Sequence, residues 1–114
     1  MIQCKRLYDE ASQEDGYRIL VDRLWPRGMK KEALTYDEWC KALAPSDELR
    51  KAFHSETIDF ASFSKAYRQE LASHEDEGQR IARLADDQTV TLLYGAKDRQ
   101  QNHALVLADW LRQL

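Results

Sequence analysis

Residues that interrupt regular structure are scarce in this sequence, which contains four glycines and two prolines among 114 residues. A flexible linker or a proline-rich tail depends on such residues, so neither is expected. No apolar run approaches the roughly 18 residues that span a membrane, and the start of the chain has no apolar signal core. We therefore expect one cytoplasmic α/β domain over residues 1–114, without a membrane partner.

Residues that bind metals or form redox pairs are also few. The two cysteines, Cys4 and Cys40, lie far apart in the sequence and do not form a CxxC pair. In a reducing compartment such cysteines are most often reduced and partly buried, so we predict neither a disulfide nor a thiol-bound metal. The three histidines, at positions 54, 74 and 103, lack the close spacing of zinc ligands. The sequence thus predicts no metal ion and no cofactor.

Several motifs that indicate a particular reaction are absent from the sequence. The chain has no Walker loop, no GxGxxG, no GxSxG, no HExxH and no Cys-x5-Arg phosphate loop after Cys40. Covalent catalysis by a cysteine therefore has little support. The net charge of −3, from 17 basic and 20 acidic residues, argues against non-specific attachment to nucleic acid or membranes.

Hydrophobic patterning predicts three main strands, which share β-branched and aliphatic residues: 2–7, 17–25 and 89–95. Within the second of these, residues 19–21 form a continuous apolar run typical of a strand covered on both faces. The segment 36–43 fits a short strand as well as a helix. Helical segments separate the late strand from the early ones, which favours a mostly parallel sheet.

The predicted helices each follow a residue that can cap a helix N-terminus: residues 47–53 after Ser46, the segment from Asp59, and the segment after Asn102. The apolar stripe from residue 59 to 85 is too long for one helix in so small a domain, so we expect a break between Ser73 and Gly78. Together these elements predict a small three-layer α/β sandwich with a Rossmann- or flavodoxin-like character.

Charged residues gather where two predicted strands end. Residues 22–28 follow the apolar run and contain Asp22, Arg23, Trp25 and Arg27. The late strand is followed by a second set: Lys97, Asp98, Asn102 and His103. Ligands of open parallel sheets bind outside the carboxyl ends of the strands, so we expect the two sets to face one cleft if the strands are neighbours.

The residues at these strand ends suit an anionic ligand. Arginine binds phosphate and carboxylate with a planar fork, so Arg23 and Arg27 are candidate ligand-binding residues. The alternative is a solvated basic loop in which Arg23 pairs with a carboxylate. Backbone N–H groups at the start of the helix near Asn102 would add further donors for an anion. Lys97 and Asp98 complete the candidate ligand-binding set on the second strand end.

Asp22 and His103 are the candidate catalytic pair. Asp22 ends an apolar run where a charge needs a partner, which suits either a general base or a structural ion pair. His103 suits proton transfer, or a half-buried histidine bonded to the backbone. Trp25 suits stacking on a ligand ring or closing the edge of the core. His54 is a candidate ligand-binding residue of the same cleft, and the alternative is that it caps the C-terminus of the preceding helix.

Several of these segments, in order, resemble the YeaO-like branch of the bacterial domain-of-unknown-function 488 family. The segments are Val21–Gly28, Leu43–Ser46 with Leu49-Arg50, Phe53-His54, Thr91–Tyr94 and Asn102-His103-Ala104. The resemblance covers Ile2 to Leu114 and implies a small stand-alone cytoplasmic α/β protein, without implying a particular activity. Related branches carry a cysteine where this chain has Tyr94 and a Cys-His-Arg where it has Asn102-His103-Ala104. A thiol or metal role of those branches is therefore not transferred to this chain.

Three functions remain open from the sequence. The chain is an enzyme acting on a small anionic metabolite or nucleotide, a non-catalytic module that binds such a ligand, or a nucleic-acid accessory protein using residues 23–31. The net charge and the lack of basic residues interleaved with exposed aromatics count against the third. The sequence gives no indication of the oligomeric state.

Overall fold

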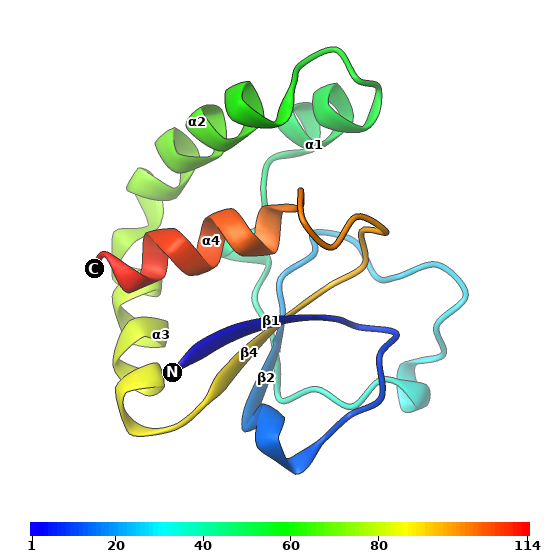
Figure 1. Cartoon of the computed structure of the whole chain (residues 1–114), viewed down its shortest axis with the longest axis vertical. Helices are drawn as coiled ribbons and strands as arrows, with labels where there is room; N and C mark the ends of the chain where they lie inside the picture. Colours follow the sequence, from blue (N-terminus) through cyan, green and yellow to red (C-terminus); the bar gives the residue numbers. More distant parts are fainter.

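Four parallel strands in the order β1-β4-β2-β3 form the sheet of the computed structural model, which describes all 114 residues (Figure 1). The strands are β1 (Ile2–Arg6), β2 (Tyr17–Leu20), β3 (Glu38–Trp39) and β4 (Val90–Tyr94). The α-helices are α1 (Asp47–His54), α2 (Phe60–Leu71), α3 (Glu75–Asp87) and α4 (His103–Arg112). None of the helices is both long and apolar enough to cross a membrane.

Strand β4 lies in the middle of the sheet because all five of its side chains can be buried. Its residues are β-branched, aliphatic or aromatic, and each is buried. On one side it pairs with β1 and on the other with β2, where Leu20 lies opposite Leu93. The carboxyl ends of β2 and β4 are therefore adjacent, as the sequence predicts.

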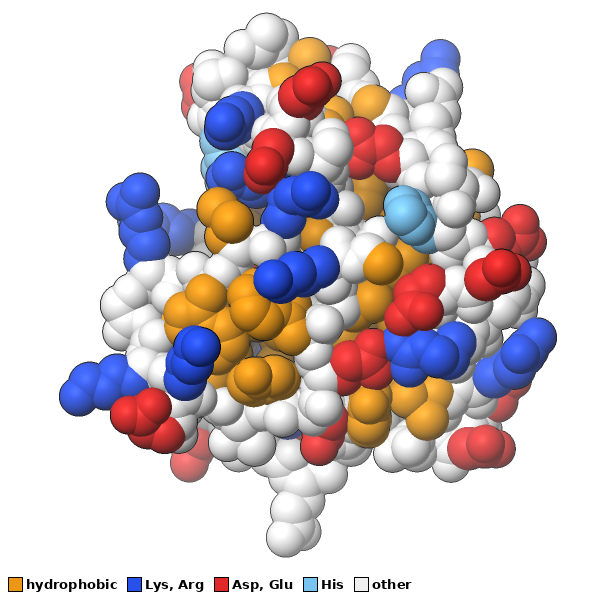
Figure 2. Space-filling model, turned by 180° about the vertical axis from the view of Figure 1, so that it is seen from behind, with side chains coloured by type: hydrophobic (Ala, Val, Ile, Leu, Met, Phe, Trp, Pro, Cys, Tyr) orange, Lys and Arg blue, Asp and Glu red, His pale blue; other side chains and the backbone are white.

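The helices cover only one face of the sheet. A cluster of 19 buried residues joins that face to all four helices, with Phe63, Tyr67 and Leu107 among its largest members. On the other face a smaller cluster contains Leu20 and Leu93 and is covered by the loop between β2 and β3. Figure 2 shows hydrophobic side chains gathered on the side of this loop, with lysine and arginine side chains around them.

The α/β class and the parallel sheet are confirmed, but the third layer is not a layer of helices. The chain passes from β2 to β3 through residues 21–37 without an α-helix, and Trp25 and Met29 from this loop cover the second face together with Trp39 of β3. Large aromatic side chains can cover four leucines without a helix because each buries much apolar area. The strand order also differs from the Rossmann and flavodoxin orders, so that more specific prediction is not confirmed.

The helix caps agree with the sequence, whereas two boundaries differ. Ser46, Asp59 and Asn102 each accept a hydrogen bond from a backbone N–H three residues later. The predicted break occurs slightly earlier, in a 3₁₀ turn at Ala72–His74. The second strand ends at Leu20 rather than near Trp25. Residues 36–43 divide into β3 and a 3₁₀ turn, so the strand at the sheet edge is only two residues long.

Candidate functional site

A cavity of about 290 Å³ lies beyond the adjacent carboxyl ends of β2 and β4. We call it the strand-end cavity. It brings together six of the nine predicted site residues: Asp22, Arg23, Trp25, Arg27, His54 and His103. The first four come from the loop after β2, whereas His54 ends α1 and His103 begins α4. The cavity therefore contains all four residues predicted at the end of the second strand, but only His103 of the four predicted after the late strand.

Asp22 connects the two strand ends. Its Oδ2 accepts a hydrogen bond of 2.9 Å from the backbone N–H of Gly95, the residue that follows β4. Its Oδ1 lies 3.2 Å from Nε2 of His103, and the same Nε2 lies 3.1 Å from the carbonyl oxygen of Val21. Both neighbours of Nε2 are acceptors, so this nitrogen carries the hydrogen. One hydrogen serves one acceptor well, which leaves Oδ1 buried without a well-formed hydrogen bond.

Three arginines give the strand-end cavity an excess of positive charge. Arg23 Nε lies 3.4 Å from Asp47 Oδ1, and Arg50 Nη2 lies 3.5 Å from the same oxygen. Arg27 is exposed and forms no ion pair within 4.0 Å. The buried Nε of Arg50 also has no hydrogen-bond partner. Asp22 is the one carboxylate that lines the cavity, against three arginines.

The remaining predicted residues lie beside this cavity rather than in it. Lys97 and Asp98 line a neighbouring cavity of about 1060 Å³, which His54 also borders. Asp98 Oδ1 accepts hydrogen bonds from the backbone N–H groups of Gln100 and Gln101, which lower the pKa of its carboxyl. Asn102 is 1% exposed; its Oδ1 caps α4 and its Nδ2 donates to the carbonyl oxygen of Asp98. These contacts shape the start of α4.

Trp25 closes the edge of the core, one of its two predicted roles. Its indole N–H donates a 2.7 Å hydrogen bond to the carbonyl oxygen of Met29. Its ring packs edge-on against Tyr36 and Trp39, with ring centroids 5.7 and 5.5 Å away. These contacts hold the loop that also carries Arg23 and Arg27.

Sequence reasoning did not include Arg50 among the site residues. Arg50 lies in the N-terminal half of α1, where the helix dipole favours acidic residues over a cation. An arginine at such a position indicates that its side chain interacts with a group outside the helix. The sequence could not show that α1 points this half at the carboxyl ends of the strands, because the angle between helix and sheet depends on the packing of α1 against α2.

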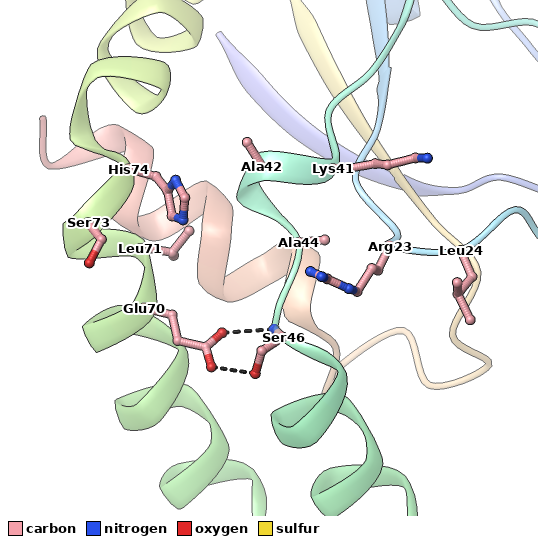
Figure 3. Close-up of a pocket in the computed structure, with 10 residues that line it drawn as sticks. All are labelled: Arg23, Leu24, Lys41, Ala42, Ala44, Ser46, Glu70, Leu71, Ser73 and His74. Carbon is pink, nitrogen blue, oxygen red and sulfur yellow. Dashed lines mark hydrogen bonds between the residues drawn. The ribbon is translucent and has the colours of Figure 1, made fainter.

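Arg23 also borders a wider surface groove of about 740 Å³ between residues 41–46 and the end of α2 (Figure 3). Glu70 extends into this groove, but its carboxylate accepts hydrogen bonds of 2.8 and 2.6 Å from the backbone N–H and hydroxyl of Ser46. The groove therefore offers no carboxylate free to act on a ligand. Its size exceeds that of the strand-end cavity, but its charged groups do not converge.

Glu38, Cys40 and Glu77 form the one cluster with ligand atoms close enough to hold a metal, within 4.8 Å of one another. Arg80 donates hydrogen bonds to both carboxylates, and the hydroxyl of Tyr17 donates to Glu38. The Arg80 guanidinium also lowers the pKa of Glu77. The carboxylates are thus already neutralised by an arginine, which indicates a structural network.

The two thiols are expected to react slowly. Burial raises the pKa of Cys4 to about 11, and burial together with Glu77 and Glu38 raises the pKa of Cys40 to about 11. Both are unpaired. At pH 8 about one thiol in a thousand is then ionised, so we expect iodoacetamide to label the native protein about a hundredfold more slowly than a free thiol. Mass spectrometry should find two labels after denaturation. Rapid labelling of either cysteine in the native protein would contradict this prediction.

These features define a class: a small α/β protein with an all-parallel sheet and a cationic cavity at the strand carboxyl ends. Residues 1–114 match the family model described as the inactive DUF488-N3 subclade, and the chain belongs to this family. It is 66% identical over 113 residues to the uncharacterized protein YeaO of Escherichia coli (strain K12), covering 99% of this chain and 98% of that protein. The predicted resemblance to the YeaO-like branch is thereby confirmed.

More distant bacterial relatives keep nearly the same length. The uncharacterized protein Rv3073c of Mycobacterium tuberculosis (strain ATCC 25618 / H37Rv) is 34% identical over 111 residues, which cover 96% of this chain and 92% of that protein. The uncharacterized protein Mb3100c of Mycobacterium bovis shows the same identity and coverage. No solved structure matches the chain.

Proposed function

We propose that the protein is a non-catalytic module that binds the phosphate or carboxylate group of a small molecule in the strand-end cavity. The observation that carries this proposal is the convergence of Arg23, Arg27 and Arg50 on one cavity that contains a single carboxylate, Asp22. Guanidinium groups bind oxyanions through paired, charge-assisted hydrogen bonds. The proposal takes residues 1–114 as one cytoplasmic domain, in agreement with the two unpaired cysteines.

The unpartnered polar atoms of the cavity support a polar ligand. Buried donors and acceptors are nearly always paired, so an unpaired one calls for an explanation. The Nε–H of Arg50 would donate to a ligand oxyanion, and Asp22 Oδ1 would accept from a ligand hydroxyl or a protonated phosphate. Asp47 Oδ1 accepts a hydrogen bond of 3.5 Å from Arg50 and lies 3.4 Å from Nε of Arg23, so it holds both side chains only by long contacts.

Binding is favoured over catalysis because the candidate acid–base pair is occupied within the protein. Asp22 is bonded to Gly95, and the proton-bearing nitrogen of His103 faces Asp22 and the carbonyl oxygen of Val21. A general base must instead reach a proton of the substrate. Neither cysteine lines the cavity. The description of the family as inactive agrees with a binding role.

Calorimetric titration with inorganic phosphate and with acetate tests the proposal. Arg27→Ala should weaken anion binding by about 10- to 100-fold, which corresponds to the loss of a hydrogen bond to a charged group. Lys31→Ala is the matched control, because Lys31 lies in the same loop, carries the same charge and does not line the cavity. That variant should bind within about twofold of the unmodified protein.

Two results would count against the proposal. If neither anion binds at millimolar concentration, or if Arg27→Ala and Lys31→Ala weaken binding equally, the strand-end cavity is not an anion site. A further variant, His103→Gln, separates binding from catalysis, since glutamine keeps a side-chain N–H donor. If His103→Gln still binds the anion, the result supports a non-catalytic binding module. If the unmodified protein converts a phosphorylated or carboxylated substrate and His103→Gln does not, the result supports an enzyme.

A further inference from the structure

The strand-end cavity adjoins the larger cavity beside it. His54, Gly95 and Ala96 line both spaces. A third, small space of about 30 Å³ lies between them and is also lined by His54 and Ala96. Arg50, His103, Phe53 and Phe63 also line this small space. The three spaces therefore adjoin one another at His54 and Ala96, and we refer to them together as the cleft.

The two ends of this cleft differ in chemistry. The strand-end cavity has three arginines, whereas the larger cavity has Lys97 as its one lysine or arginine. The larger cavity instead has an apolar wall that includes Ile58, Phe53 and Phe60, and its rim carries the carboxylates of Glu56, Asp59 and Asp98. Phe53 stacks on the buried Phe63 with ring centroids 4.6 Å apart, and Phe60 lies 5.8 Å from Phe53. Phe53 and Phe60 remain half-buried, so their rings are open to a further contact.

The volume of the cleft is also larger than an inorganic anion needs. A water molecule takes about 30 Å³ of liquid, so the strand-end cavity alone has room for roughly ten. The additional space of about 1060 Å³ begins directly beyond His54. Small-molecule sites combine a few polar groups that fix orientation with a mostly apolar wall that provides contact area. The arginines supply the polar groups at one end of the cleft, and the phenylalanines supply the apolar contact area at the other.

We infer that the ligand has two parts: an oxyanion bound by Arg23, Arg27 and Arg50, and an aromatic ring that packs on Phe53 and Phe60. The inference rests on the proposed function, since the anionic part occupies the same cavity. A flat ring that enters past His54 extends the group of three phenylalanines by one member. Aromatic rings pair in offset or edge-on arrangements, and such pairs contribute affinity beyond the apolar area that they bury.

Pairs of probes that differ only in the ring test this inference on the intact protein. Phenyl phosphate should bind about tenfold more tightly than methyl phosphate, and benzoate should likewise exceed acetate. The phosphate pair and the carboxylate pair show which oxyanion the cavity prefers. In Phe60→Leu the advantage of phenyl phosphate should fall by about threefold to tenfold, because leucine keeps apolar volume without the ring. Binding of methyl phosphate should not change in this variant.

A second measurement covers the case in which Phe60→Leu does not fold. In amide NMR spectra of the unmodified protein, phenyl phosphate should shift residues 56–61 as well as residues 22–27, whereas methyl phosphate should shift only the latter. Equal binding of phenyl and methyl phosphate, without shifts at residues 56–61, would overturn the two-part ligand and leave the anion site standing. No binding of either probe would overturn the proposed function itself.

Discussion

Asp15→Ala is expected to destabilise the protein by about 3–5 kcal/mol, because it leaves a buried arginine without its partner. Arg18 is 4% exposed and forms an ion pair with Asp15, which is 3% exposed. Lys5 Nζ lies 3.2 Å from both carboxylate oxygens, and the backbone N–H of Ser12 donates to the same group at 3.0 Å. Against a typical total stability of about 5–15 kcal/mol, this loss threatens folding itself. Thermal and urea unfolding measure it.

A matched control is available at the end of α4. Arg112 and Asp109 have the same three-residue spacing, but their side chains are 51% and 59% exposed. Water solvates both groups there, so Asp109→Ala should change the free energy of unfolding by less than about 1 kcal/mol. Equal losses in Asp15→Ala and Asp109→Ala would show that burial does not decide the value of these pairs.

The same carboxylate makes stability depend on pH. Burial raises the pKa of Asp15, but the Ser12 N–H, Lys5 and Arg18 outweigh it and hold the pKa below its ordinary value of 3.8. A lowered folded-state pKa contributes stability that is present above the unfolded value and is lost as the pH falls through the folded one. The stability of the unmodified protein should therefore decline below about pH 4 more steeply than that of Asp15→Asn, which has no carboxyl to protonate.

Gly95→Ala should weaken anion binding in the strand-end cavity more than it lowers the stability of the fold. A Cβ atom at this position would lie 2.8 Å from Asp22 Oδ2, closer than real side chains approach, and 3.4 Å from Leu7 Cδ2. The carboxylate can turn away, but it then loses the hydrogen bond from Gly95 at a cost of about 1–3 kcal/mol. Once displaced toward the arginines, it competes with a bound anion. We expect anion affinity to fall by about tenfold, as measured by calorimetric titration.

A double-mutant cycle shows whether the contact with Asp22 is the cause. In an Asp22→Ala background the added methyl group no longer meets a carboxylate, so the substitution at Gly95 should cost less than it does alone. Strictly additive losses in stability and in affinity would mean that the methyl group acts through Leu7 or the backbone instead.

The sequence predicted the parts of the fold that depend on local pattern. The β-branched, aliphatic and uncharged residues of β4 predicted a buried strand, and Ser46, Asp59 and Asn102 could cap helices wherever those helices lay. The proximity of Asp22 and His103 followed from the rule that parallel strands end at one edge. That step needed only the expectation that the second and last strands are neighbours.

The rest depended on long-range packing. Nothing in the pattern of residues 21–37 reveals that Trp25 covers Leu20 and Leu93 in place of a helix, since a loop and a short helix are equally able to bring an aromatic ring there. Lys97 lines the adjoining cavity rather than the strand-end cavity, and His54 at the end of α1 lines both. The place where α1 ends, which also brings Arg50 to the strand-end cavity, depends on packing and not on local pattern.

Under the proposed function, the loop between β2 and β3 couples ligand affinity to local stability. The same residues that shield one face of the sheet through Trp25 also carry Arg23 and Arg27 to the cavity. A bound oxyanion that holds these arginines therefore opposes transient opening of the loop by the free energy of its binding. Conversely, a substitution that only loosens the aromatic cover, far from any ligand atom, weakens binding by making the closed loop rarer. Evolution of the ligand site and of this half of the core is thus coupled through one segment of chain.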